Sequence, residues 1–273
     1  MMGIQLIKIH MKKTTLIPLA LLLVGWACQP AQKGSDAPAN NAMTQEVFVP
    51  ENNGYKLAWQ DDFNGTELDT TKWEYRGTGP RRIGYNDTSM VKLENGNLLL
   101  MYDIVGDSIL GAMIGSAGKY ETTYGYFECR AELQKSIGPW AAFWMQSPKI
   151  SQGTDPAEFG AEIDIFEYFN EMGKDTLQHA VHWAYGPDMQ SVGPMKSGLE
   201  GLDKGFHTFG LEWTDTKYAF FIDGLKFFEQ TKGISKIDQY IILSMEIRDK
   251  LEGFKKACAP DTFKVDYVKV YKK

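Results

Sequence analysis

Apolar and polar side chains alternate in short runs over most of the chain, from about residue 55 to its end. Alternation with a period of two predicts β-strands, and no segment carries an apolar stripe at helical spacing over three turns. The expected strands lie within residues 95–105, 122–133, 141–146, 161–169, 179–185, 206–214, 217–229, 240–247 and 263–271.

The connections between these runs are rich in turn residues. Asn95-Gly96 and Asp223-Gly224 are typical of two-residue hairpin turns. Many short strands with tight connections, and no repeat of fixed period, predict an all-β fold, either a β-sandwich or a jelly roll. Two longer stretches, 147–160 and 186–205, are expected to be loops that border a binding site.

The N-terminus has the features of an export signal. Lys12 and Lys13 precede an apolar run over residues 16–26, which is too short to span a bilayer comfortably. Residues 1–27 are therefore predicted to be a signal peptide. The small-x-small sequence before Cys28 resembles the lipobox of bacterial lipoproteins, so we expect Cys28 to be lipidated. The alternative is a secreted protein in which Cys28 is unmodified.

Residues 28–54 are rich in Pro, Ala, Asn and Gln, and we expect them to form a flexible linker with a reach of about 25 Å. The folded domain is expected to span residues 55–273. The protein is thus predicted to be an outer-membrane or cell-surface lipoprotein, or otherwise periplasmic or secreted.

The charge of the chain bears on its partners. The net charge is −6, and removal of residues 1–27 leaves 26 basic and 35 acidic residues, a net charge of −9. Such a chain is poorly suited to bind nucleic acid or an anionic membrane surface, so membrane contact is expected only through a lipid at Cys28. We expect a monomer with a neutral or weakly charged partner.

Cysteine usage gives no sign of a disulfide scaffold or a metal cluster. After Cys28 only Cys129 and Cys258 remain, and no CxxC or His-rich spacing is present. Cys129 shares its parity with Phe127 and Ala131 in a predicted strand. It is therefore expected to be a buried free thiol.

The run "AEIDIFEYF" at 161–169 places three acids in an apolar strand. Glu162 and Asp164 would share one face, but strict alternation would bury Glu167 without a partner, which is very costly. A β-bulge at Ile165 or Phe166 shifts the parity and returns Glu167 to the acidic face. The sequence therefore predicts a bulge there, with all three carboxylates on the wet side of a sheet.

Three neighbouring carboxylates repel, so at least one is expected to hold a proton near neutral pH. Glycoside hydrolysis needs one ionised and one protonated carboxyl group beside the bond. With the bulge, the glutamate Cα atoms would lie roughly 13 Å apart, which permits a retaining pair but does not require one. A solvated acidic face and a Ca²⁺ site remain open as alternatives.

The segment "EIDIFE" resembles the E-x-D-x-x-E signature of glycoside hydrolase family 16 in its bulged form. Further landmarks similar to that family follow in its order: "WQDDFNGTELDTTKWEY", "YGYFECRAELQKSIGPWAAFW", "FHTFGLEWTDTKYAFFIDG" and "FKVDYVKVY". The resemblance covers residues 55–273. It implies a concanavalin-like jelly roll and endo-acting, retaining hydrolysis of β-linked polysaccharides without a catalytic cofactor.

The resemblance also implies residue roles. Glu162 would be the nucleophile, Glu167 the general acid and base, and Asp164 a hydrogen-bond partner that adjusts both. Trp140, Trp144, His182 and Trp183 match positions that line the cleft in relatives, with Trp140 preferred over Trp144 as a sugar-binding ring. A structural Ca²⁺ would lie at the backbone near Asp62 and Gly96 and at the side chain of Asp266.

The match departs from the β-1,3-glucanase branch at Arg81 and Arg82, where that branch has a Trp-Gly-Asn-rich segment. Two arginines in a cleft loop would suit a sulfated or uronic polysaccharide, and a solvated turn is the alternative. From the resemblance as a whole we expect a β-1,3- or mixed-linkage β-glucan as substrate. An algal galactan such as agarose, porphyran or carrageenan is the next candidate. A non-catalytic sugar-binding jelly roll and a transglycosylase remain alternatives.

Overall fold

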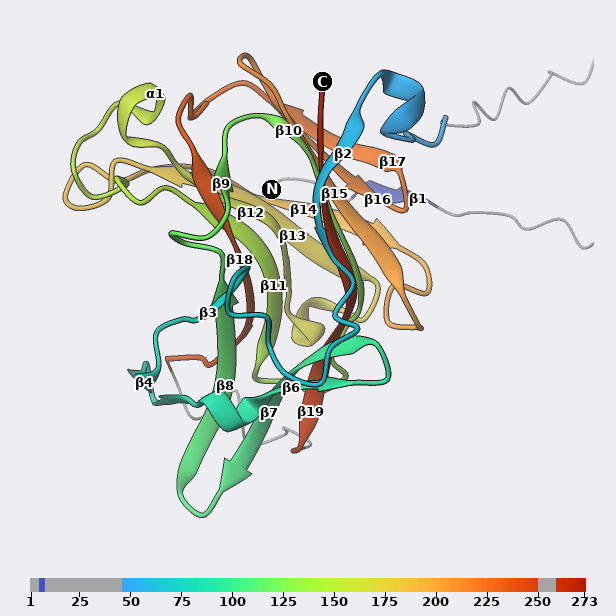
Figure 1. Cartoon of the computed structure of the whole chain (residues 1–273), viewed down its shortest axis with the longest axis vertical. Coiled ribbons are helices and arrows are strands. Elements are labelled where there is room, and N and C mark those ends of the chain that lie inside the picture. Colours follow the sequence, from blue (N-terminus) through green and yellow to red (C-terminus); the bar gives the residue numbers. More distant parts are fainter. Residues whose placement is uncertain (1–4, 8–45, 250–258) are drawn as a thin grey trace, which may run out of the picture.

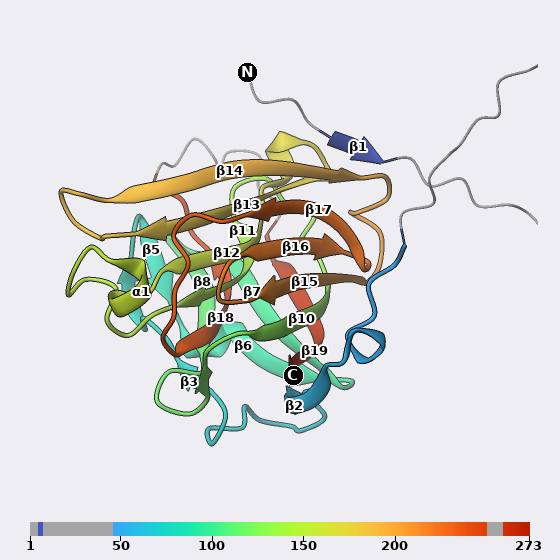
Figure 2. The ribbon, with the colours of Figure 1, turned by 90° about the horizontal axis from the view of Figure 1, so that it is seen from above.

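Two curved antiparallel sheets face each other across a continuous apolar core (Figures 1 and 2). The computed structural model describes residues 5–7, 46–249 and 259–273. Strands dominate these residues, and the one α-helix, α1 (Pro156–Phe159), has a single turn. The predicted all-β jelly roll is confirmed.

The first sheet, called here the cleft sheet, bears the three acids on its concave face. Its strands in spatial order are β14 (Gln190–Leu199), β13 (Thr176–Trp183), β12 (Glu162–Tyr168), β11 (Trp140–Gln146), β18 (Gln239–Glu246) and β8 (Ser108–Gly115). Two short strands complete it: β3 (Glu74–Tyr75), which pairs with β8, and β9 (Glu121–Thr122), which pairs with β18.

The second sheet, called here the outer sheet, packs behind the cleft sheet. Its strands in order are β17 (Leu225–Gln230), β16 (Tyr218–Ile222), β15 (His207–Trp213), β10 (Gly125–Glu132) and β19 (Asp261–Lys272). One half of the long strand β19 pairs with β2 (Lys56–Asp61) and the other half with β7 (Asn97–Val105), which in turn pairs with β6 (Val91–Glu94).

A smaller group of strands extends the cleft sheet beyond β8. The hairpin of β4 (Gly79–Arg81) and β5 (Gly84–Asn86) lies against β8, with β5 running parallel to it. Strand β7 of the outer sheet also pairs with β8 of the cleft sheet, so the β7–β8 hairpin links the two sheets. The remaining elements are the 3₁₀ turns η1 (Glu51–Asn53), η2 (Thr88–Met90) and η3 (Asn170–Met172), and the parallel strand β1 (Gln5–Ile7) beside β14.

The two predicted hairpin turns are present. Asn95 and Gly96 have φ values of 52° and 71°, and Asp223 and Gly224 have φ values of 50° and 72°. In each case both central residues take the positive φ that a type I′ turn requires, which Asn, Asp and Gly tolerate best. These turns fix the pairing of β6 with β7 and of β16 with β17.

The predicted bulge in β12 is confirmed. Phe143 of β11 lies opposite Phe166, and the next residue, Trp144, lies opposite Asp164, so Ile165 is the extra residue. Ile165 and Phe166 are both buried in the core, and the Phe166 ring packs 4.2 Å from that of Phe209 on the outer sheet. The parity shift therefore places two consecutive apolar side chains in the core and leaves Glu167 on the concave face.

A buried histidine on the neighbouring strand holds the bulge. A bulge leaves part of the strand ladder unpaired, and here His179 Nδ1 lies 2.6 Å from the carbonyl oxygen of Ile165. Its Nε2 lies 2.7 Å from Ser197 Oγ, so both ring nitrogens have partners. Burial lowers the pKa of His179 to about 4, which keeps the ring neutral, with Nδ1–H donating to Ile165.

Two stretches differ from the sequence-based expectation. Residues 190–199 form the edge strand β14 rather than part of a long loop. Within the expected linker, the Phe48 ring stacks on that of Tyr126 at 4.9 Å, and the Phe48 N–H donates to the Gly224 carbonyl at 2.8 Å. The ordered domain therefore begins before residue 55, because Phe48 covers an aromatic cluster on the outer face of the outer sheet.

Cys129 is buried and free, as expected, whereas Cys28 and Cys258 lie outside the described residues. Most of the predicted signal peptide also lies outside them. Among the helices that the structure describes, none has the length and apolar character needed to cross a bilayer.

Replacing His179 with Phe should leave the Ile165 carbonyl buried and unpaired. We expect the free energy of unfolding to fall by about 1–3 kcal/mol, because that is the usual cost of an unsatisfied buried polar group. His179→Asn, which keeps a donor near the Nδ1 position, should recover part of this loss. Chemical denaturation of the three proteins measures the difference, and equal losses in both variants would contradict the bonding role.

Candidate active site

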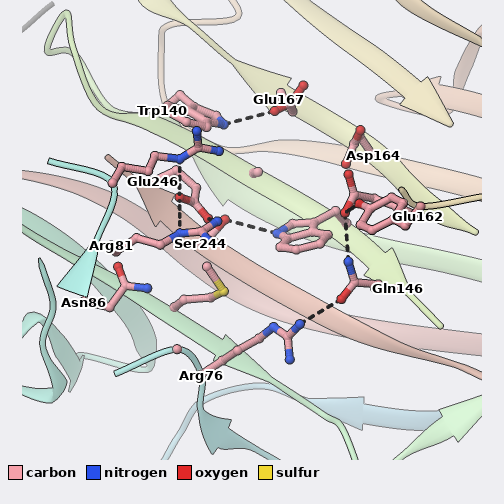
Figure 3. A pocket seen from close by; sticks show the side chains of 16 residues that line it. Arg76, Arg81, Asn86, Trp140, Gln146, Glu162, Asp164, Glu167, Ser244 and Glu246 are labelled. Carbon is pink, nitrogen blue, oxygen red and sulfur yellow. Dashed lines mark hydrogen bonds and ion pairs between the residues drawn. The ribbon is translucent and has the colours of Figure 1, made fainter. Parts of the chain in front are cut away.

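The three acids of β12 face a cleft of about 500 Å³ on the concave surface of the cleft sheet (Figure 3). Its walls include side chains from β11, β18, β8, β4 and β5. Glu162, Asp164 and Glu167 all line it, so the structure brings together the three carboxylates that the sequence singled out. The bulge is what makes this shared exposure possible.

One oxygen of Glu162 is held by two donors. Gln146 Nε2 donates to Glu162 Oε2 at 3.0 Å, and the Tyr185 hydroxyl donates to the same oxygen. Behind them, Arg76 and Tyr240 both donate to Gln146 Oε1, at 2.8 and 2.7 Å, which fixes the amide so that its NH₂ group faces Glu162. Gln146 and Tyr185 thus hold the Glu162 carboxylate in a fixed position in the cleft wall.

Glu167 is in a different environment. Trp140 Nε1 donates to Glu167 Oε1 at 3.1 Å, and Gln178 Nε2 donates to Oε2 at 2.9 Å. Burial, and secondarily the charge of Glu162, raise the pKa of Glu167, while the bonds from Gln178 and Trp140 oppose this rise. The raised pKa favours the protonated form of Glu167.

Asp164 lies between the two glutamates and is almost fully buried. Burial first, and then the charges of Glu162 and Glu167, raise the pKa of Asp164 well above its usual range. His182 Nε2 lies 3.3 Å from Asp164 Oδ2, and its Nδ1 lies 2.7 Å from Ser191 Oγ. A protonated Asp164 can therefore donate to His182 and separate the two glutamates without adding charge.

The expected sugar-binding tryptophans have different surroundings. Trp140 lines the cleft but is only 7% exposed, since its ring stacks on Phe169 at 5.0 Å and lies under the Arg82 guanidinium at 5.2 Å. Trp144 also lines the cleft and is less buried, with Nε1 donating to Ser244 Oγ at 3.1 Å. These contacts leave little of the Trp140 ring free for a sugar, so Trp144 is the better placed of the two tryptophans to stack on one.

Trp183 does not belong to the cleft. Strand alternation turns it away from its neighbour His182, and it packs against the main core and against Gly233, where an added Cβ would lie 2.5 Å from the indole. Its predicted role in sugar binding is corrected to a packing role. His182 reaches the site only through Asp164, as described above.

The two arginines that departed from the family pattern line the cleft rather than a solvated turn. Arg81 forms a bidentate pair with the buried Glu246, at 2.8 and 3.1 Å. Arg82 pairs with Asp249 at 2.8 Å and lies 3.7 Å from Glu246. Arg76 also lines the cleft, and it donates to two neutral side chains, Gln146 and Tyr240.

The residues proposed for Ca²⁺ do not fit that ion. Strand register brings the segments of Asp62, Gly96 and Asp266 side by side, since β19 pairs with both β2 and β7. The Asp266 carboxylate, however, forms an ion pair with Arg130, and Asp62 accepts from Gln60. A cation thus already neutralises the one side chain that was expected to bind calcium.

In the part of the chain that the structure describes, Glu162, Asp164 and His182 are the one group of three acidic, His or Cys side chains close enough to hold a metal ion. Their ligand atoms lie within 4.8 Å of one another. A protonated Asp164 that donates to His182 also explains why these three side chains lie so close together.

The sequence-based reasoning missed five residues that contact the carboxylates or the Gln146 amide: Gln146, Gln178, Tyr185, Arg76 and Tyr240. For two of them a signal existed. Gln146 has the parity of Trp144 on β11, and Gln178 that of His182 on β13, so both had to face the acids of β12. Tyr185 and Arg76 lie in irregular segments, where parity gives no guide.

Comparison with known proteins agrees with this geometry. A family model described as "Beta-porphyranase A-D, GH16 domain" matches residues 57–273. A glucan endo-1,3-beta-glucosidase A1 of Niallia circulans is 27% identical over 80% of this chain, and a keratan-sulfate endo-1,4-beta-galactosidase of Sphingobacterium multivorum is 25% identical over 89%. The chain spans only 38% and 61% of the length of these two relatives.

A solved structure supports the fold assignment. The laminarinase from Flavobacterium sp. UMI-01 superposes with a TM-score of 0.65 at 27% identity. The alignment covers 80% of this chain and all of that one.

Proposed function

Because this chain belongs to glycoside hydrolase family 16, we propose that it is an endo-acting, retaining glycoside hydrolase of β-linked polysaccharides. One observation carries the proposal: the bulge in β12 places Glu162 and Glu167 on the same cleft wall, with Asp164 between them. The two glutamates are in unlike environments, which is what separate nucleophile and acid roles require.

In the first step, Glu162 Oε1 attacks the anomeric carbon and forms a glycosyl ester. The glycosidic C–O bond breaks, and its electron pair stays on the leaving oxygen, which takes the proton of Glu167. Gln146 and Tyr185 hold the other oxygen of Glu162, so the attacking atom keeps a fixed direction. The leaving sugar departs as a neutral alcohol.

In the second step, Glu167 is ionised and acts as a base. It takes a proton from a water molecule whose oxygen attacks the anomeric carbon, and the ester bond breaks to return Glu162 as a carboxylate. Trp140 and Gln178, which donate to Glu167, stabilise this ionised form. Two displacements at the same carbon retain its configuration. An acceptor sugar in place of water would make the same site a transglycosylase.

For the substrate we propose a galactan that carries anionic groups. Three arginines and four carboxyl groups line the cleft. With Asp164 and Glu167 protonated, as their raised pKa values favour, three cations face two carboxylates. Arg76 has no acidic partner among the described residues and is the best placed to receive a sulfate. The porphyranase description of the matching family model agrees with this class.

A neutral β-1,3- or mixed-linkage glucan is the second candidate. The Niallia relative and the Flavobacterium structure are a glucanase and a laminarinase by name, and Trp144 offers a ring for a neutral sugar. The two candidates differ in one chemical property of the polymer, its sulfate groups. A comparison of sulfated and desulfated forms of one galactan can therefore separate them.

Glu162→Gln and Glu167→Gln should each lower turnover of the correct polysaccharide by about a thousandfold or more, because each removes a group that acts in the transition state. A reducing-sugar assay would use porphyran, desulfated porphyran, agarose, carrageenan, laminarin and lichenan. Azide should restore rate to Glu167→Gln on a substrate with an activated leaving group. Full activity of either variant would contradict the assigned roles, and binding without turnover by the unmodified protein would indicate a lectin.

The pH dependence of kcat/KM should separate the two glutamates. Gln178→Met removes a bond that lowers the pKa of Glu167, so Glu167 should stay protonated to higher pH and the basic limb should move to higher pH. Tyr185→Phe removes a donor to Glu162 and none to Glu167, so it should leave the basic limb where it is. Each variant is the control for the other, and a shift of the same limb in both would contradict the assignment.

We also propose that the protein is exported and attached to a membrane through a lipid on Cys28, since the signal-like segment and a following polar tether support this. Cells that express the full chain and are fed a labelled fatty acid should label it. Cys28→Ser should lose the label and move the protein to the soluble fraction. An unlabelled parent protein would indicate plain secretion.

A further inference from the structure

Asn86 lines the cleft far from the three carboxylates. The strands run in the order β12, β11, β18, β8 and β5, and Asn86 lies on β5 opposite Gly111 of β8. Neighbouring strands are about 4.8 Å apart, so four steps along the sheet amount to roughly 19 Å before curvature. Only a substrate of several sugar rings can extend from the acids to this position.

The Asn86 amide is buried and has no partner. The residue is only 4% exposed, and neither Oδ1 nor Nδ2 makes a hydrogen bond. Across the described part of the chain, it is the one side chain that leaves both a donor and an acceptor unpaired in this way, and the other unpaired groups lie outside the cleft. Such groups are rare because they are costly, and a bound ligand or water is the usual explanation.

The backbone around Asn86 is held firmly. Its neighbour Asp87 donates its N–H to the Gly111 carbonyl at 3.0 Å, and the Asp87 side chain accepts from Ser89 N–H at 2.8 Å. At the other end of the hairpin, Arg81 is paired with Glu246. At Gly84 an added Cβ would lie 2.3 Å from the Ile109 carbonyl oxygen, so the hairpin lies directly on β8. The backbone that carries the amide is therefore held in one position, which lowers the entropy lost on binding.

We infer that Asn86 is a specificity-determining residue that binds neighbouring hydroxyl groups of a sugar ring at the distal end of the cleft. An amide offers one acceptor and one donor, and a hydroxyl can complement either, whereas a sulfate ester has no hydrogen to give to Oδ1. The distal site thus selects an unsulfated ring, in contrast to the region near Arg76. This inference rests on the proposed function, since it assumes a polysaccharide in the cleft.

The test measures how affinity depends on chain length. In a Glu162→Gln background, porphyran-derived, neoagaro- and laminari-oligosaccharides from the disaccharide to the octasaccharide are titrated by calorimetry. Asn86→Ala should weaken the longest oligosaccharides of the binding series about tenfold and leave the shortest unchanged, because only long chains extend to the amide. Asn97→Ala is the matched control, since Asn97 also has an unpaired buried oxygen but lies outside the cleft. It should change the affinity for neither short nor long oligosaccharides.

An equal effect of Asn86→Ala on short and long chains, or no effect with the thermal midpoint preserved, would overturn the inference. Turnover of polysaccharide by the unmodified protein is measured alongside. If turnover is present and the length dependence is unchanged, the Asn86 inference alone fails. If neither turnover nor binding is found with any of these sugars, both it and the proposed function fail.

Discussion

The hydrogen bond between the His179 ring and the Ile165 carbonyl supports the whole concave site. A strand of seven residues has to place four apolar side chains in the core and turn three acids toward the cleft, and regular alternation cannot do both. The bulge resolves this conflict, but it leaves a carbonyl group in the core that only a fully buried donor can satisfy. His179 supplies that donor, and its lowered pKa keeps the ring neutral where a charge would be costly.

The number of charged groups is limited in the cleft as well as in the core. Three carboxyl groups share a small volume, and burial together with mutual repulsion pushes protons onto Asp164 and Glu167. Hydrogen-bond donors are then distributed unequally: two converge on one oxygen of Glu162, and one goes to each oxygen of Glu167. The asymmetry between nucleophile and acid thus comes from neutral neighbours, whereas the arginines pair mainly with Glu246 and Asp249.

Local patterns were sufficient for much of the fold. The hairpins at Asn95-Gly96 and Asp223-Gly224 follow from two residues each, and the bulge follows from a parity conflict within nine residues. What the sequence could not distinguish was Trp140 from Trp144, because both have the same parity on β11. They differ only in what covers them, and Phe169 and Arg82 come from separate segments whose arrival at Trp140 depends on the complete fold. His179 was missed for the same reason, since its partner lies on another strand.

The packing of Phe48 fixes where the N-terminal tether leaves the domain. Phe48 lies against Tyr126 and Phe221, on the outer face of the outer sheet, whereas the cleft opens on the opposite side of the sandwich. A polar tether from Cys28 to this point reaches about 25 Å, and a domain of this size has a radius of gyration of about 17 Å. Only a tether stretched well beyond this average length would pass around the domain. If Cys28 carries the proposed lipid, the average tether length favours an arrangement in which the outer sheet faces the bilayer and the cleft opens away from it.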